Sequence, residues 1–285
     1  MVRKSAEQSR HPHWTANRQF DFCAEPVGNA FTVQMDAANQ PQLKRREGDA
    51  IQISGDYQAR ALKSDRAAQR FWHEAKFRLI ERIAMPGKQD RVLDAGCGSG
   101  TITYFLSQHA GESVGIDSNP SAIAYASDAY KTPNLQFRLG QFDDLMGGKP
   151  FDKIYSIEVI EHLYEDQVAD VLSLFYKLAN PGAQLFITTP NYRSAWPLIE
   201  WLLDRFGLVA KLDDAQHVTH FTKRRLVAVC KRAGWTVRHI GTFNGLAPFL
   251  APISRRLALG LEEVEFLLNR ALPQNLLFCL CTRDV

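Results

Sequence analysis

The stretch RVLDAGCGSG at residues 91–100 constrains the fold of this chain more than any other feature. A short apolar run ends there at Asp94 and passes directly into a turn with glycines at alternate positions: Gly96, Gly98 and Gly100. Glycine lets the backbone of such a turn approach a ligand closely, because no Cβ stands in the way. The pattern indicates a strand that leads through a ligand-binding loop into a helix.

The spacing of these glycines argues against a dinucleotide ligand. A nicotinamide or flavin fingerprint carries its third glycine three positions beyond the second, where Thr101 stands in this sequence. Asp94 also places a carboxylate beside the loop, which repels a pyrophosphate and attracts an ammonium or sulfonium group. We therefore expect a positively charged nucleoside-like ligand.

Strand and helix patterns alternate along most of the chain. Strands are predicted at residues 91–95, 113–117, 135–139, 151–158, 183–190, 235–243 and 275–282, and helices near 100–109, 120–130, 165–179 and 223–233. One or two helices precede the glycine loop, and residues 246–271 form a further helical stretch. This alternation predicts a doubly wound α/β fold, which binds its ligands at the carboxyl ends of the strands.

Length and composition fit one elaborated soluble domain. Residues 1–55 are polar and form an expected N-terminal extension with one short strand pattern, AFTVQM, and residues 56–285 form the main domain. No apolar run reaches the ~18 to 20 residues of a membrane span. The N-terminus lacks the apolar core of a secretory signal, so we expect a cytoplasmic protein. The five cysteines contain no C-x-x-C pair, which argues against a zinc ribbon.

Polar residues follow the second and third predicted strands where a nucleoside would lie. Asp117 ends the second strand about 20 residues beyond the first glycine, the position from which a carboxylate accepts hydrogen bonds from ribose hydroxyls. Gln141 and Phe142 follow the third strand, where they can meet the edge and face of an adenine ring.

A second group of polar residues follows the fourth predicted strand. The stretch EVIEHL places Glu158, Glu161 and His162 just past that strand, and the later stretch QHVTHFT supplies His217 and His220. Two carboxylates and two imidazoles together suit a divalent ion with mixed oxygen and nitrogen ligands.

The motifs VLDAGCGSG, GIDSNP and FDKIYSIEVIEHL, in this order, resemble those of class I S-adenosylmethionine-dependent methyltransferases, in particular the ubiquinone-pathway O-methylating type. The resemblance implies a seven-stranded, mainly parallel sheet whose last strand is antiparallel, with S-adenosyl-L-methionine as the cofactor. By this resemblance, the methionine moiety is contacted by Asp94, Gly96, Gly98 and Gly100. The ribose is contacted by Asp117, and the adenine by Gln141 and Phe142. Cys97, Ser118 and Glu158 complete the expected cofactor site.

The EVIEHL stretch is also similar to that of small-RNA terminal 2′-O-methyltransferases. This resemblance implies a divalent metal ion held by Glu158, Glu161, His162 and His217. In the alternative without a metal, Glu158 borders the cofactor site and His162 is the candidate general base, with His217 second, because an imidazole titrates near neutral pH. Glu158, His162 and His217 are thus the candidate catalytic residues, and His220 is expected to be structural.

Two later segments bear on the methyl acceptor. The insert 191–221 is rich in aromatic residues and leucine up to residue 216, and either walls the acceptor pocket or forms a helix-packing stripe. The apolar stretch 246–271 either packs into the core or, with its arginines, covers a lipid-like substrate or contacts a membrane surface peripherally.

These observations favour methyl transfer to a small or lipid-like acceptor, in the first place a hydroxyl. RNA 2′-O-methylation is an alternative, favoured by the basic residues between 215 and 261, but no recognised RNA-binding module accompanies them, so nucleic acid is not the expected partner. A second alternative is a non-catalytic module that retains the cofactor pocket.

Overall fold

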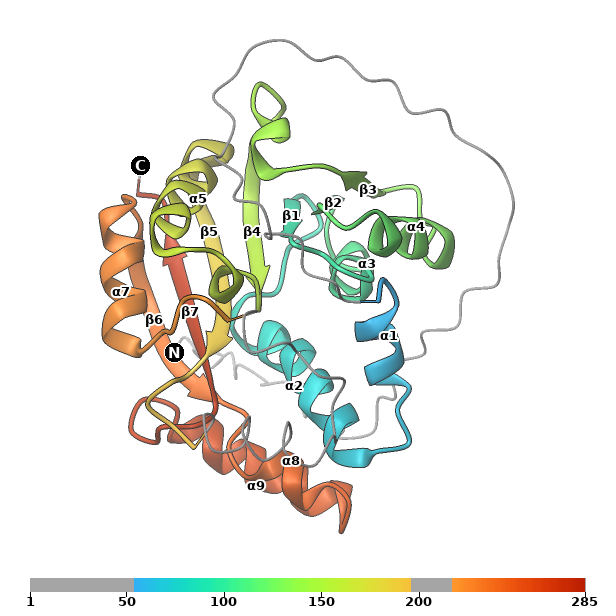
Figure 1. The fold of residues 1–285 in the computed structure, drawn as a ribbon, viewed down its shortest axis with the longest axis vertical. Coiled ribbons are helices and arrows are strands. Elements are labelled where there is room, and N and C mark those ends of the chain that lie inside the picture. Colours follow the sequence, from blue (N-terminus) through green and yellow to red (C-terminus); the bar gives the residue numbers. More distant parts are fainter. Residues whose placement is uncertain (1–53, 196–216, 285) are drawn as a thin grey trace, which may run out of the picture.

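The computed structural model describes residues 54–195 and 217–284, which are built around a seven-stranded sheet (Figure 1). The strand order is β3-β2-β1-β4-β5-β7-β6. The strands are β1 (Arg91–Ala95), β2 (Glu112–Asp117), β3 (Leu135–Leu139), β4 (Phe151–Ile157), β5 (Ala179–Pro190), β6 (Thr236–Phe243) and β7 (Leu276–Thr282). Neighbours from β3 to β5 pair in parallel, whereas β7 is antiparallel to both β5 and β6. The predicted fold class and the antiparallel last strand are therefore confirmed.

Helices cover both faces of the sheet. They are α1 (Tyr57–Leu62), α2 (Ala67–Ile83), α3 (Thr101–Ser107), α4 (Pro120–Ala129), α5 (Glu165–Leu178), α7 (Lys223–Arg232), α8 (Ala247–Leu250) and α9 (Arg255–Leu267), with 3₁₀ turns η1 (Phe142–Leu145) and η2 (Ile160–His162). One apolar cluster joins the sheet to α5 and α7, and a second joins its other face to α2 and α3. Val92 and Leu93 on β1 belong to different clusters and are both fully buried, as expected for a parallel sheet covered on both sides.

Most predicted elements lie within a residue or two of their observed bounds, and two differ. β5 begins at Ala179 rather than at residue 183, because the chain leaves α5 directly into extended backbone. The helical stretch predicted at 246–271 consists of two helices, since Pro252 interrupts the pattern and the Ser254 hydroxyl accepts a hydrogen bond from the Leu257 amide at 3.4 Å to begin α9.

Some predictions fall outside the residues that the structure describes. These are the AFTVQM strand pattern, the N-terminal extension up to residue 53, and residues 196–216 of the insert. Within the described ranges, no helix combines the length and apolarity needed to cross a bilayer.

Candidate active site

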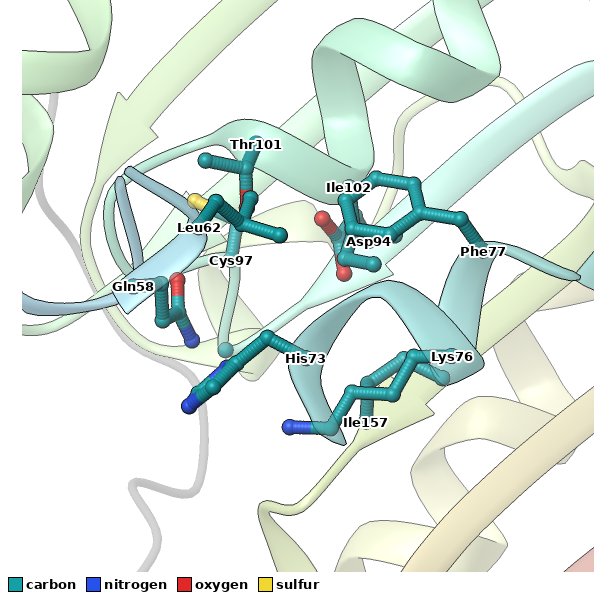
Figure 2. Close-up of a pocket in the computed structure, with 11 residues that line it drawn as sticks. Gln58, Leu62, His73, Lys76, Phe77, Asp94, Cys97, Thr101, Ile102 and Ile157 are labelled. Atoms are coloured by element: carbon teal, nitrogen blue, oxygen red, sulfur yellow. The ribbon is translucent and has the colours of Figure 1, made fainter. Parts of the chain in front are cut away.

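A pocket lies at the carboxyl end of β1, between the glycine loop and the helices α1 and α2 (Figure 2). It is open to solvent, and its volume, including that open space, is about 350 Å³. It is lined by Gln58, Leu62, His73, Lys76, Phe77, Asp94, Gly96, Cys97, Thr101, Ile102 and Ile157. The predicted residues Asp94, Gly96 and Cys97 thus meet there, together with side chains of α1 and α2 that sequence analysis missed.

The glycine loop has the backbone that its sequence predicts. Gly96, Gly98 and Gly100 have φ values of +77°, +51° and +77°, which side chains with a Cβ rarely adopt. A Cβ on Gly98 would lie 2.5 Å from Oε1 of Gln58. That oxygen accepts hydrogen bonds from the Ser99 amide at 3.0 Å and the Ser99 hydroxyl at 3.2 Å. The Gln58 side chain of α1 therefore packs against the loop at Gly98, where a larger residue would displace it.

Asp94 is a buried carboxyl at the edge of this pocket. Its side chain is nearly inaccessible to solvent, and burial raises its pKa from 3.8 to about 7. The Thr103 hydroxyl opposes this shift by donating a hydrogen bond to Oδ2 at 2.6 Å, and the charge of Asp117 adds to it. A cation placed beside Asp94 would favour the ionised form and so recover the energy that burial costs.

Asp117 connects the end of β2 to the glycine loop. Its Oδ2 accepts a hydrogen bond from the Gly98 amide at 2.8 Å, and its Oδ1 accepts one from the Asn119 amide at 2.8 Å. Asn119 in turn begins α4 by accepting hydrogen bonds from the amides of Ser121 and Ala122. Asp117 is only partly buried and Ser118 is exposed, so both can meet a ligand that extends from the pocket along the strand ends.

The predicted adenine residues lie beyond the lining of this pocket. Gln141 precedes η1, where its amide donates to Asp144 at 2.7 Å. The Phe142 ring packs edge-on against Phe175 of α5, with centroids 5.3 Å apart, so part of this ring belongs to the core. The structure therefore places both residues at the end of β3, as predicted, and their contact with an adenine stays a prediction.

Glu158 pairs with a lysine that sequence analysis missed. It follows β4 with φ +56°, a strained value for a residue with a Cβ, and its amide donates to the Thr188 carbonyl at 3.0 Å. Its carboxylate forms an ion pair with Lys76, which is nearly inaccessible, whereas a quarter of Glu158 is exposed. The position of this lysine between Ala75 and Phe77, which are both buried, was the signal in the sequence that could have revealed this pair.

His73 and Tyr57 surround this ion pair. Burial lowers the pKa of His73 well below 6.5, and the charge of Lys76 adds to the effect, so His73 is neutral at pH 7. Burial and the charge of Glu158 raise the pKa of Tyr57, whose ring meets His73 edge-on at 6.0 Å. Lys76 is thus a cationic side chain in a pocket otherwise lined by neutral groups and the Asp94 carboxyl.

The structure brings together three of the four predicted metal ligands. Glu161, His162 and His217 each offer a ligand atom within 4.8 Å of the others, and the two imidazole centroids are 5.0 Å apart. Glu158 is not part of this group, because its carboxylate pairs with Lys76.

Glu161 is the most deeply buried member of this group. Its Oε2 accepts a hydrogen bond from the Thr189 hydroxyl at 3.0 Å, and its Oε1 is buried without a hydrogen-bond partner in the part of the chain that the structure describes. Burial and the charge of Glu158 raise its pKa to about 8, whereas His217 opposes this shift.

Tyr192 connects the two later histidines. Its hydroxyl lies 3.2 Å from Nδ1 of His217, and its ring stacks on His220 at 3.9 Å. His220 is exposed, and its structural role stays a prediction.

Comparison with known proteins identifies the class of this chain. A family model described as a methyltransferase domain matches residues 65–240, which is more than half of the sequence. The chain therefore belongs to the methyltransferase domain family, as its motifs predicted.

Individual relatives are more distant. The ubiquinone biosynthesis O-methyltransferase of Hahella chejuensis is 32% identical over 115 residues, which cover 39% of this chain and 47% of that protein. A probable S-adenosylmethionine-dependent methyltransferase of Mycolicibacterium smegmatis is 24% identical over 181 residues, covering 63% of this chain and 65% of that protein. The chain thus spans less than two thirds of the length of either relative.

The fold is also that of solved methyltransferases. The crystal structure of a SAM dependent methyltransferase from Archaeoglobus fulgidus has a TM-score of 0.54 to this chain at 21% identity, covering 73% of this chain and 93% of that one. At this identity the similarity establishes the fold alone.

Proposed function

We propose that this chain transfers a methyl group from S-adenosyl-L-methionine to a hydroxyl of a small or lipid-like acceptor. The observation that carries the proposal is the buried Asp94 carboxyl, which lines a pocket beside the glycine turn. Family membership supports methyl transfer, and similarity to ubiquinone biosynthesis O-methyltransferases supports an oxygen acceptor.

The pocket has the charges that this cofactor needs. Asp94 would accept a hydrogen bond from the cofactor's ammonium group, and Lys76 is the side chain suited to its carboxylate. Asp117 would accept from the ribose hydroxyls, as it now accepts from the loop amides. When bound, S-adenosyl-L-methionine supplies a methyl group that its sulfonium already makes electrophilic.

Catalysis then depends on positioning the acceptor and removing its proton. The His162 imidazole is the proposed general base for the acceptor hydroxyl, with His217 second, because both belong to the cluster that they form with Glu161. The Tyr192 hydroxyl orients His217 through Nδ1. Glu158 connects this group to the cofactor pocket through its ion pair with Lys76.

A divalent metal ion is a second candidate for activating the acceptor. The observation that favours it is the buried Oε1 of Glu161, which lacks a hydrogen-bond partner among described residues and lies beside two imidazoles. Glu161, His162 and His217 would hold the ion, which would lower the pKa of a bound hydroxyl. Elemental analysis of the purified chain, with Glu161→Gln as the control variant, decides between the two: no bound metal and full activity in chelator exclude the metal.

The proposed function is tested by binding and by transfer. Calorimetry should show binding of S-adenosyl-L-methionine and its demethylated product by the wild-type chain, and at least about tenfold weaker binding by Asp94→Ala. Radiolabelled methyl should then appear in lipid and phenolic fractions. Label in RNA supports 2′-O-methylation instead, and tight binding without transfer to any fraction supports the non-catalytic module.

A further inference from the structure

The carboxyl-terminal helices α8 and α9 expose an unusually apolar surface. Of the ten large apolar side chains that are exposed in the described ranges, eight lie between residues 246 and 272. We call them the α8–α9 face: Leu246, Phe249, Ile253, Leu257, Val264, Leu267, Leu268 and Leu272. Ile253 and Leu267 are about four-fifths exposed, at 79% and 81%. Apolar surface gathered in one place, unlike scattered single residues, indicates an interaction site.

The exposure of its side chains shows that α9 is oriented with apolar residues outward. Leu257, Gly260, Val264 and Leu267 recur at intervals of three and four residues, so they share one side of the helix. Ala258 and Glu265, on the other side, are buried. A surface helix of a soluble protein ordinarily has the reverse arrangement.

The acids of α9 are bound to the protein body. Glu262 accepts a hydrogen bond from Arg78 of α2 at 2.7 Å, and Glu263 forms an ion pair with Arg82. The buried Glu265 carboxylate accepts hydrogen bonds from the amides of residues 245–247, where α8 begins. None of these acids therefore presents an unpaired charge beside the apolar side chains.

Basic side chains border the same surface. Arg256 is exposed next to Leu257, and Arg270 is exposed between Leu268 and Leu272. Arg255 is partly neutralised by Glu74 of α2, at 2.6 Å. A surface of leucines and isoleucine bordered by arginines is the arrangement with which interfacial helices bind anionic lipid.

The location of this surface is compatible with a planar partner. Figure 1 shows α8 and α9 at the lower edge of the molecule, at the end to which the arrowheads of β4 and β5 point. α8 follows the carboxyl end of β6, which runs parallel to β5 because both pair antiparallel with β7. The α8–α9 face thus lies at the carboxyl ends of the strands, as the candidate active site does.

We propose that the α8–α9 face docks on an anionic phospholipid bilayer. A second copy of the chain is the less suitable partner, since a symmetric contact would bring the same exposed arginines of both copies together, whereas a bilayer with anionic headgroups offers the opposite charge. The inference does not depend on the proposed methyl transfer, because lipid binding is measured without cofactor or acceptor.

Vesicle cosedimentation of the full chain tests the proposal. The wild-type chain should bind vesicles of equal phosphatidylcholine and phosphatidylglycerol, and bind phosphatidylcholine alone more weakly. The double variant Leu257→Glu, Leu267→Glu should lose about tenfold or more of this binding, and Arg256→Gln should lose severalfold only on the anionic vesicles. Leu139→Glu is the matched control, because Leu139 is 57% exposed on β3, the opposite edge strand of the sheet.

Three results would overturn the proposal. One is a wild-type chain that stays in solution with anionic vesicles. Another is a Glu double variant that binds as well as the wild type. The third is light scattering that shows a dimer, dissociated by the same double variant, in a chain without lipid affinity. Thermal unfolding of each variant should match the wild type, since the substituted side chains are exposed.

Discussion

The substitution Asp94→Asn tests the buried carboxyl that borders the glycine loop. Asparagine keeps the shape of the side chain and can still accept the hydrogen bond from Thr103, but it cannot ionise. The variant therefore removes the ionisable group, and it preserves the packing around a side chain that is 2% exposed.

The size of the effect follows from the pKa of Asp94, which burial raises from 3.8 to about 7. Between these values the unfolded chain has released its proton and the folded chain still holds it, so the free energy of unfolding falls as pH rises and levels off above pH 7. From pH 5 to pH 8 this amounts to about 3 kcal/mol at ~1.4 kcal/mol per pH unit. The free energy of unfolding of the Asn variant should fall by about 3 kcal/mol less than that of the wild type, because buried Glu161, with a pKa raised to about 8, lowers the stability of both over this range.

Cofactor binding should change in the opposite direction. Because the ionised carboxylate is the form that accepts the ammonium group, the wild-type affinity for S-adenosyl-L-methionine should rise about tenfold from pH 6 to pH 8. The affinity of Asp94→Asn should be lower by about ten- to a hundredfold at pH 8, with a smaller pH dependence.

Denaturant unfolding and calorimetry across this pH range measure both effects. Asp128→Asn on α4 is the matched control, because its carboxylate is 77% exposed and its loss should leave both profiles unchanged. If the wild type and Asp94→Asn lose stability in parallel from pH 5 to pH 8, burial does not raise this pKa and the assignment of the ammonium site loses its basis.

Three further substitutions test other parts of the structure. Gly98→Ala should lower cofactor affinity and destabilise the fold by about 1 to 3 kcal/mol, since its Cβ would meet Gln58 and its φ is positive. A cofactor affinity equal to that of the wild type, measured by calorimetry, would contradict this. Lys76→Met should raise the cofactor Kd about ten- to a hundredfold, because it removes a charged hydrogen bond and leaves Glu158 unpaired; an unchanged Kd would show that Lys76 serves only Glu158. Thr222→Ala should cost about 1 kcal/mol in denaturant unfolding, because the hydroxyl begins α7, and no change would refute that role.

The glycine loop and the strand ends were predictable because they depend on local sequence. An apolar run, an acid and a glycine turn determine where β1 ends. Asp94 and Asp117 were therefore expected at the carboxyl ends of neighbouring strands, and they lie there. The contributions of α1 and α2 were not predicted, because they depend on contacts between distant residues. Gln58 precedes Ser99 by 41 residues, and Lys76 precedes Glu158 by 82.

The outward orientation of α9 was not predictable from its apolar pattern either. Helical periodicity shows that Leu257, Val264 and Leu267 share a side, but it does not show whether that side meets the core or solvent. The orientation is set by contacts of the other side of the helix, where Glu262 binds Arg78 of α2 and the buried Glu265 binds the amides of residues 245–247.

The position of β7 has a consequence for folding during synthesis. β6 is an edge strand whose sheet partner is β7, and β7 also separates it from β5. During synthesis β1 to β5 emerge before β6 and can pair with one another, because they are neighbours in the sheet. β6 stays unpaired until β7 emerges, while some 30 more residues are translated. At ~5 to 20 residues per second this interval lasts on the order of seconds, during which the apolar side chains of β6 are available to chaperones.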